Sequence, residues 1–352
     1  MNGNTGGFGK TSRPDLPSDW VVRPATTADA QNWQTLMQQH GGHWSLDWRW
    51  QQVFNQAYGL ESFYHLAQQG SKTVGIMPLI RHPAIKTGWH ALPFLDYAPP
   101  LTLQPSMASA MVAHLLSQGQ TIELRHIESQ PETQAAPGTM VTMILPLPHD
   151  QNMLWKGFSS KVRNQVRKAE KSGITVIQGR QHLPVFYHLW RERMRQLGTP
   201  AHARSWFTAI MDHFEEAQIF IAMHQDKPVG GLFHLRVGQT ALVPWAASKR
   251  ELRSLCINHA LYWAAMEHSL NMGATQFDFL RSQVGQGTYS FKKQWGAQAY
   301  ALSYLRYRPD GSIKDCSHPG KGRAKQLFSR LWPHLPDFLR QKLDTPLRLR
   351  IP

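Results

Sequence analysis

The chain of 352 residues is long enough for two domains of ordinary size, and its 41% hydrophobic residues, with 13 Trp and 15 Phe, exclude disorder along its whole length. Lys and Arg number 38 against 23 Asp and Glu, a formal net charge of +15, which favours nucleic acids, anionic lipid surfaces, or phosphorylated and acyl-carrier substrates without choosing among them. Cys256 and Cys316 are the only cysteines, so a disulfide framework and a four-cysteine zinc site are excluded.

Residues 1–18 are rich in Gly, Asn and Pro and lack the apolar centre of a secretory signal. We predict a disordered leader there and a cytoplasmic protein. The sequence contains no apolar run of ~18 or more residues, the length that a membrane-spanning helix needs.

A first domain is predicted over residues 19–150. Its expected elements are a strand at 20–22, a helix ending near 40, a hairpin of strands at 62–68 and 73–80, a helix at 106–118, and strands at 121–126 and 140–145. Three tryptophans between residues 44 and 50 are expected to be core residues.

A second domain is predicted over residues 151–308. Its expected elements are helices at 183–196, 205–214 and 257–270, and strands at 218–224, 229–237, 276–280 and 299–306, one further strand ending at 248. The hairpin at 220–230 repeats the pattern of the one at 63–75, with an apolar strand, a polar turn containing Lys, and Val-Gly entering the partner strand. This repeat indicates a duplicated α/β unit.

A strongly basic helix is predicted over residues 161–173. Val162, Val166 and Ala169 share one face. The other faces carry Lys161, Arg163, Asn164, Arg167, Lys168 and Lys171. Like charges at these spacings destabilise an isolated helix by a few tenths of a kcal/mol per pair. We therefore favour an anionic partner over a merely solvated face.

The segment 277–297 joins a short strand to a turn with Gly285 and Gly287, and then to Lys292 and Lys293. Glycines let backbone approach a ligand closely, and adjacent cations suit an anion. A hairpin with a solvated basic turn is an equally good interpretation of this local pattern.

Residues 309–352 form a predicted basic amphipathic tail. Such a tail either docks on its own protein, which we favour, or lies on the anionic inner surface of the membrane.

The chain has no zincin His-Glu pattern, no Gly-x-Ser-x-Gly elbow and no Gly-Lys-Thr/Ser phosphate loop in the required context. Cys256 opens an apolar helix and is interpreted as a packing residue. The sequence therefore predicts no metal site and no covalent catalysis, and points to ligand positioning by cations and backbone amides.

Several ordered motifs, spread over residues 20–345, together resemble the FemAB-like acyltransferases, and in particular the exosortase/PEP-CTERM-associated FemAB-related proteins. The motifs are the basic helix, the Leu-Gly-Thr-Pro sequence at 197–200 that ends the preceding helix, the segment 277–296, and the first-domain stretches 75–79 and 93–101. The resemblance implies an α/β (α+β) fold of two tandem GNAT-like (acyl-CoA N-acyltransferase-like) domains, with mixed sheets flanked by helices.

The resemblance also implies transfer of an acyl or aminoacyl group to an amine, in the assembly of a cell-envelope, exopolysaccharide or peptidoglycan-type precursor. Acyl-CoA, an acyl-carrier or aminoacyl-tRNA would be the donor substrate, with no tightly bound cofactor. The alternative is a non-catalytic basic module that binds nucleic acid or anionic lipid.

Carried over by position, Phe291 and Lys292 match a Phe-Lys pair associated with donor engagement. Lys161, Arg163 and Arg167 match the basic helix that opens the second domain of relatives. The further expected donor and substrate contacts are Arg281, Ser282, Gly285, Gly287, Lys293, Asp96 and Tyr97. The tetrahedral intermediate needs donors at its oxyanion, which Lys292 or the amides near 281–287 would supply. The attacking amine would lose its proton to Asp278, to Tyr289, or to the substrate itself.

Two positions depart from the pattern of relatives. Leu280 stands where they commonly carry Gly, and Ala98-Pro99 replaces a glycine pair after Asp96-Tyr97. The sequence also lacks a heptad stretch for the long helical arm of some relatives, which weakens the case for tRNA.

Overall fold

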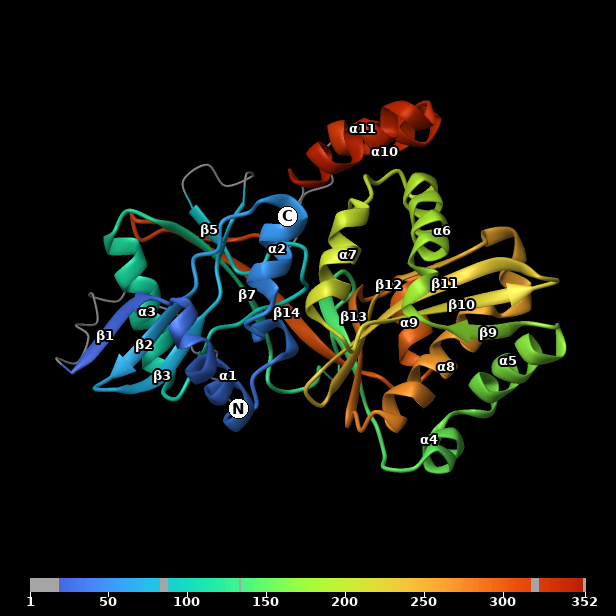
Figure 1. Ribbon diagram of the computed structural model, residues 1–352, viewed down its shortest axis with the longest axis horizontal. Helices are drawn as coiled ribbons and strands as arrows, with labels where there is room; N and C mark the ends of the chain where they lie inside the picture. The colour runs from blue at the N-terminus through green and yellow to red at the C-terminus, as the bar shows by residue number, and fades with distance from the viewer. Residues whose placement is uncertain (1–18, 83–87, 133, 318–322, 351–352) are drawn as a thin grey trace. The chain divides into compact units, whose positions relative to one another are not determined.

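The computed structural model describes residues 19–82, 88–132, 134–317 and 323–350 (Figure 1). The predicted leader over 1–18 lies outside the described residues. The chain divides into two compact units that are discontinuous in sequence. Unit 1 comprises Met1–Trp48, Glu61–His126 and Tyr304–Cys316, and unit 2 comprises Arg49–Leu60, Ile127–Ser303 and Ser317–Pro352. The predicted domain limits after residues 150 and 308 stay a prediction, because the two units are defined by contacts within the fold and do not test domain limits along the sequence.

Unit 1 is built on a sheet of strand order β1-β2-β3-β6, with antiparallel neighbours throughout. The elements of this unit are β1 (Trp20–Pro24), α1 (Ala30–Gln39), β2 (His65–Gln69), β3 (Lys72–Met77), β4 (Ile80–Arg81), β5 (Gly88–His90), β6 (Leu101–Thr102), α3 (Pro105–Ser117), β7 (Thr121–Ile127) and β15 (Ile313–Asp315). The predicted hairpin is present as β2 and β3, and Gly70 turns between them at φ 58°.

The predicted tryptophan core is confirmed. Trp44 and Trp48 are buried in unit 1, and Trp50 is buried in unit 2 beside Phe214. Trp33 is also buried, and its indole N–H donates to the carbonyl of Leu46 at 2.7 Å. Buried indoles need such partners because an unpaired N–H in a core is costly.

Unit 2 is built on the part of a larger sheet in which the strands run in the order β14-β8-β13-β12-β11-β10-β9. Its elements are α2 (Trp50–Tyr58), β8 (Met140–Pro146), α4 (Gln151–Gly157), α5 (Ser160–Lys171), β9 (Thr175–Gln178), α6 (Leu183–Gln196), α7 (Arg204–His213), β10 (Gln218–His224), β11 (Lys227–Val237), β12 (Thr240–Ser248), α8 (Ile257–Asn271), β13 (Gln276–Gln283), α9 (Gly287–Lys293), β14 (Gln298–Tyr307), α10 (Arg323–Leu331) and α11 (Asp337–Arg348). Strands β12 and β13 are parallel and are linked through α8.

Two adjacent glycines show how helices cover both faces of this sheet. Neighbouring strand residues point to opposite faces. A Cβ at Gly230 would lie 2.6 Å from Ile257 of α8, whereas a Cβ at Gly231 would lie 3.1 Å from Phe186 of α6. The sheet therefore lies between α8 on one face and α6 on the other.

Helix α9 is an element that the sequence did not predict. The segment after β13 was expected as a glycine turn, yet Gly287–Lys293 is helical. Seven residues with Gly, Thr and Ser are poor helix formers alone. Phe291 packs against Tyr262 of α8 at a ring separation of 5.2 Å, so tertiary packing supplies what local propensity lacks.

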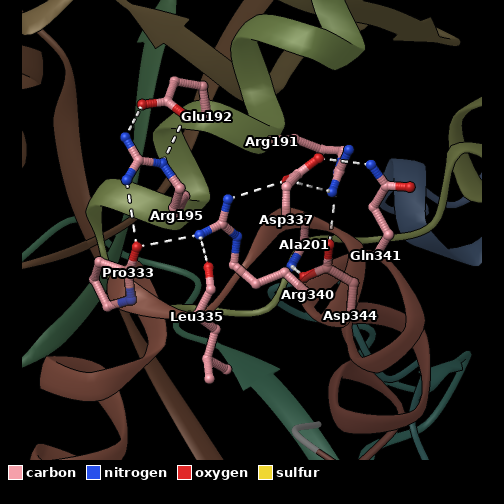
Figure 2. A network of polar contacts seen from close by, with 10 residues as sticks. All are labelled: Arg191, Glu192, Arg195, Ala201, Pro333, Leu335, Asp337, Arg340, Gln341 and Asp344. Carbon is pink, nitrogen blue, oxygen red and sulfur yellow. Dashed lines mark hydrogen bonds and ion pairs between the residues drawn. The ribbon is translucent and has the colours of Figure 1, made fainter.

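The C-terminal tail docks on its own protein, as the sequence favoured. Trp332 follows α10 directly and is 1% exposed. Figure 2 shows Arg191, Glu192 and Arg195 of α6 in one polar network with residues of the tail. No helix among the described residues is both long and apolar enough to span a membrane.

Candidate functional site

The parallel strands β12 and β13 separate part-way along their length. Their pairing ends at Leu242 and Asp278, although β12 continues to Ser248 and β13 to Gln283. Backbone groups along the separated stretch of β12 are available to a ligand that adds to the sheet there. This opening lies at the carboxyl ends of both strands, where α/β proteins commonly bind ligands.

A bulge in β13 sits beside this opening. The register between β13 and β8 shifts between Asp278 and Arg281, and Leu280 has φ 60°. A left-handed backbone costs a residue with a side chain roughly 1–2 kcal/mol. Leu280 thus occupies a conformation that glycine adopts freely, which fits the glycine that relatives commonly carry at this position.

Asp278 holds the bulge from within the sheet. Its carboxylate accepts the Leu280 backbone N–H at 2.8 Å and the hydroxyl of Thr142 on β8 at 2.7 Å. The residue is 0% exposed. Asp278 therefore touches the backbone of the site rather than an open surface.

Lys292 holds the same bulge from α9. Its ammonium group donates to the carbonyl of Leu280 at 2.7 Å and to that of Arg281 at 2.8 Å. The residue is 7% exposed. A buried ammonium is costly unless its hydrogens find acceptors, and here two carbonyls turned by the bulge provide them.

An aromatic cluster joins α8, β13 and α9 on one side of the bulge. Tyr262 stacks on Phe279 at 5.4 Å, and Phe291 lies 5.2 Å from both Tyr262 and His259. Trp295 is buried beside His259. This packing fixes α9, and with it Lys292, against β13.

The basic helix α5 packs on α8, as the predicted apolar face requires. Val162, Val166 and Ala169 are buried, and Ser159 caps the helix by accepting the Val162 N–H. Lys161 and Lys168 are exposed. The helix thus presents cations beside the start of α8.

The charges of Lys161 and Lys168 affect the pKa values of two titratable groups at the start of α8. Burial, and then the charge of Lys161, lowers the pKa of His259 to about 4, so its imidazole is neutral at pH 7. Burial raises the pKa of the Cys256 thiol, and the charge of Lys168 partly opposes that shift. Cys256 donates its S–H to Gln165 of α5, which agrees with the predicted packing role.

The two arginines of α5 turn toward α4 instead. Arg163 donates to the carbonyls of Lys156 and Phe158 at 3.1 and 2.5 Å. Arg167 lies over the Trp155 ring, 5.5 Å from its centre. Their contacts join α5 to the helix before it.

A group of arginines that the sequence did not single out gathers at the end of β12. Arg250 and Arg253 lie on the short 3-10 turn between β12 and α8. Burial, and then the charges of these two residues, lowers the pKa of Arg193 on α6. Because α6 and this turn are far apart in sequence, no local pattern could have identified the group. Three guanidinium groups within range of one another favour an anionic ligand.

The remaining predicted residues of unit 2 lie around the bulge and α9. Arg281 is exposed, Ser282 is buried on β13, Gly285 turns at φ 89°, and Gly287 begins α9. Tyr289 is half-buried, and the Lys293 ammonium lies 5.7 Å from the centre of its ring.

Asp96 and Tyr97 belong to unit 1. Tyr97 is 1% exposed, and its hydroxyl accepts the Trp44 indole N–H at 2.7 Å. The Tyr304 hydroxyl donates to the carbonyl of Asp96 at 2.8 Å. In unit 1 these contacts join the stretch 93–101 to Trp44 and to Tyr304.

Comparison with known proteins identifies the domain in which this site lies. Residues 156–293 match the family model described as an acetyltransferase (GNAT) domain, a range that runs from the end of α4 to the end of α9. The chain has no significant match among curated proteins.

Solved structures show the same fold over most of the chain. FemX is 15% identical, with a TM-score of 0.61 over 88% of this chain and 100% of FemX. A tandem GNAT protein from the clavulanic acid biosynthesis pathway is 13% identical, with a TM-score of 0.54 over 83% of this chain and 99% of the other.

A third structure is the C-terminal domain of a putative lysylphosphatidylglycerol synthetase from Agrobacterium fabrum. It is 8% identical, with a TM-score of 0.51 over 80% of this chain and 92% of the other. The predicted α/β fold of tandem GNAT-like domains is confirmed, and so is the FemAB-like resemblance at the level of domain and fold.

Proposed function

Because the chain carries a GNAT domain within a tandem GNAT fold, we propose that it is an N-acyltransferase or aminoacyltransferase whose donor binds in the opening between β12 and β13. Acyl-CoA, an acyl-carrier and aminoacyl-tRNA are the donor classes, and the acceptor is an amine on a cell-envelope, exopolysaccharide or peptidoglycan-type precursor. We also propose that the reaction runs in the cytoplasm. The exosortase association stays a prediction that rests on the sequence motifs.

The parting of β12 from β13 is the observation that carries this proposal. The pairing stops at Leu242 and Asp278 while both strands continue, so an extended donor segment that contains amide groups has strand backbone to pair with. Cations flank the same end of the strands, from α5 and from the turn that holds Arg250 and Arg253. All three donor classes carry phosphate, which such cations bind.

In the reaction, the acceptor amine attacks the carbonyl carbon of the donor thioester or ester. A C–N bond forms, the carbonyl π electrons move to oxygen, and the intermediate then expels the thiolate or alkoxide. The amine loses one proton and the leaving group gains one. Hydrogen-bond donors at the developing oxyanion contribute roughly 3–4 kcal/mol each.

We assign Asp278 and Lys292 to positioning rather than to the proton transfer and oxyanion contact that the sequence suggested. Both side chains are buried and bind the backbone of the bulge. These contacts hold the Leu280 backbone in the left-handed conformation, and so they set the direction in which β13 diverges from β12. Tyr289 and the substrate remain the proposed routes for the amine proton.

Donor binding tests the proposal. Purified protein would be titrated with acetyl-CoA, acyl-carrier protein and aminoacyl-tRNA, each followed by calorimetry and by mass spectrometry of the complex. The Lys161→Ala/Lys168→Ala variant should bind the preferred donor roughly tenfold more weakly, since each of the two lost charge contacts is worth about 0.7 kcal/mol. Lys171→Ala is the matched control on the same helix and should bind normally.

Transfer separates this function from its alternative. Wild-type protein with the preferred donor should acylate an amine acceptor. Binding of bulk polyanion without binding or transfer from any of the three donors would favour the non-catalytic basic module and overturn the proposal.

A further inference from the structure

The contact between the C-terminal helices α10 and α11 and helix α6 combines the buried Trp332 with several charged side chains. The side facing α6 is charged: the Arg195 guanidinium donates to the Pro333 carbonyl at 3.4 Å, and Arg191 pairs with Asp337 and Asp344, each at 3.5 Å (Figure 2). Arg340 donates to carbonyls of the tail itself, with Pro333 at 3.1 Å. The interface is therefore held by ion pairs and carbonyl contacts.

The docking is specific and close. The Asp344 carboxylate accepts the Ala201 backbone N–H at 2.9 Å, and a Cβ at Gly198 would lie 2.1 Å from the Ser329 carbonyl oxygen. Trp332 stacks on Phe328 at 5.2 Å and is buried. The tail thus has one defined orientation on α6, and its outer side is equally defined.

That outer side carries large apolar side chains. Leu327 is 58% exposed, Leu331 is 57% exposed and Phe338 is 61% exposed. Leu327 and Leu331 are four residues apart and so share one face of α10. Burying these side chains against α6 would have stabilised the docked tail further, yet they stay exposed while Trp332 and charged residues make that contact. An apolar partner for the outer side explains this arrangement.

Exposed cations accompany the apolar side chains. Arg330 lies beside Leu331, Lys342 lies one helical turn after Phe338, and Arg350 follows α11. The exposed acid of α11's first turn, Asp337, is already paired with Arg340 at 3.0 Å. The side that carries Leu and Phe is therefore positively charged at its edges.

We propose that the outer side of α10 and α11 binds the surface of an anionic lipid bilayer, with Leu327, Leu331 and Phe338 inserted at the headgroup boundary. Leucine and phenylalanine gain from contact with acyl chains, and neighbouring Lys and Arg gain from anionic headgroups. A nucleic acid would satisfy the cations but not the leucines, so lipid is the better match. This inference goes beyond the transfer reaction and does not depend on it.

Vesicle sedimentation tests the inference with the full-length protein. Wild-type protein should bind vesicles of phosphatidylglycerol mixed with phosphatidylcholine, and it should bind vesicles of phosphatidylcholine alone much more weakly. Raised salt should weaken the first interaction. The Leu327→Ser/Leu331→Ser/Phe338→Ser variant should lose about tenfold or more in vesicle partitioning.

The control variant is Met153→Ser/Met272→Ser, because these two side chains are 63% and 44% exposed and belong to α4 and to the end of α8 instead of the tail. It should partition as the wild type does. Equal binding by the tail variant and the wild type, or no binding of wild type to phosphatidylglycerol vesicles, would overturn the inference. Unchanged donor binding by the tail variant would separate this result from the proposed transferase function and confirm that the variant is folded.

Discussion

Replacing Leu280 by Ala and by Gly tests the bulge of β13, because here we expect the glycine variant to be more stable than the alanine variant, which is the reverse of the usual order. Inside a regular strand or helix, Gly is less stable than Ala by roughly 0.5–1 kcal/mol, because it loses more backbone freedom on folding. At Leu280 the backbone is left-handed, with φ 60°. Alanine would keep that strain and glycine would remove it.

The size of the reversal follows from two opposing terms. Relief of the left-handed strain is worth about 1–2 kcal/mol, and the greater freedom of glycine in the unfolded chain costs about 0.4–1 kcal/mol. We expect Leu280→Gly to be more stable than Leu280→Ala by about 0.5–1 kcal/mol. Both should be less stable than the wild type, since the Leu280 side chain is 6% exposed and its loss leaves a cavity.

Urea unfolding followed by tryptophan fluorescence measures the difference. Leu235 provides the control pair: it is fully buried in β11 and has no positive φ, so Leu235→Gly should be less stable than Leu235→Ala. The reasoning fails if the alanine variant at position 280 is as stable as the glycine variant or more so.

Three further outcomes are expected. Thr142→Val should lower the free energy of unfolding by about 1–3 kcal/mol, because Asp278 loses a buried donor, and a drop no larger than that of an exposed Thr→Val change would argue against the contact. Lys292→Met should lower stability together with transfer, since two carbonyls of the bulge lose their partner; lost transfer with unchanged urea midpoint would instead make Lys292 the oxyanion donor. The pKa of His234 is lowered to about 3 by burial and by the charges of His268 and Arg236. His234 of the unfolded chain therefore binds a proton below pH ~6.5, whereas in the folded chain it stays neutral until about pH 3. This residue alone should therefore lower stability by about 1.4 kcal/mol per pH unit between these values. Urea midpoints from pH 7.5 downward would measure this slope, which His234→Gln should reduce by one proton.

The sequence predicted elements well where one periodic pattern dominated. The limits of α6 and β10 agree with the predicted 183–196 and 218–224, and the apolar face of α5 is buried as expected. The family resemblance identified Leu280 as the unusual residue of its motif, because a glycine is expected at that position. The positive φ of Leu280 explains why glycine would suit the position.

The roles of Asp278 and Lys292 were not readable from local pattern. The bulge that they hold exists because β13 pairs with β8, whose Thr142 is 136 positions away in the chain. Helix α9 and the arginine group around Arg193 likewise depend on contacts between distant segments. The sequence suggested catalytic roles for Asp278 and Lys292, and their backbone contacts are the basis for proposing positioning roles instead.

The pairing of β13 with β8 also determines where a fragment that contains this domain should begin and end. Residues 156–293 match the GNAT family model, but β8 spans Met140–Pro146 and so lies outside them. A fragment cut at the limits of the match would leave the β8 edge of β13 bare and remove the hydroxyl that Asp278 accepts. Unpaired edges pair with other copies, so such a fragment should aggregate. A piece that keeps these pairings has to begin before Met140 and include the first residues of β14, which pair with β8.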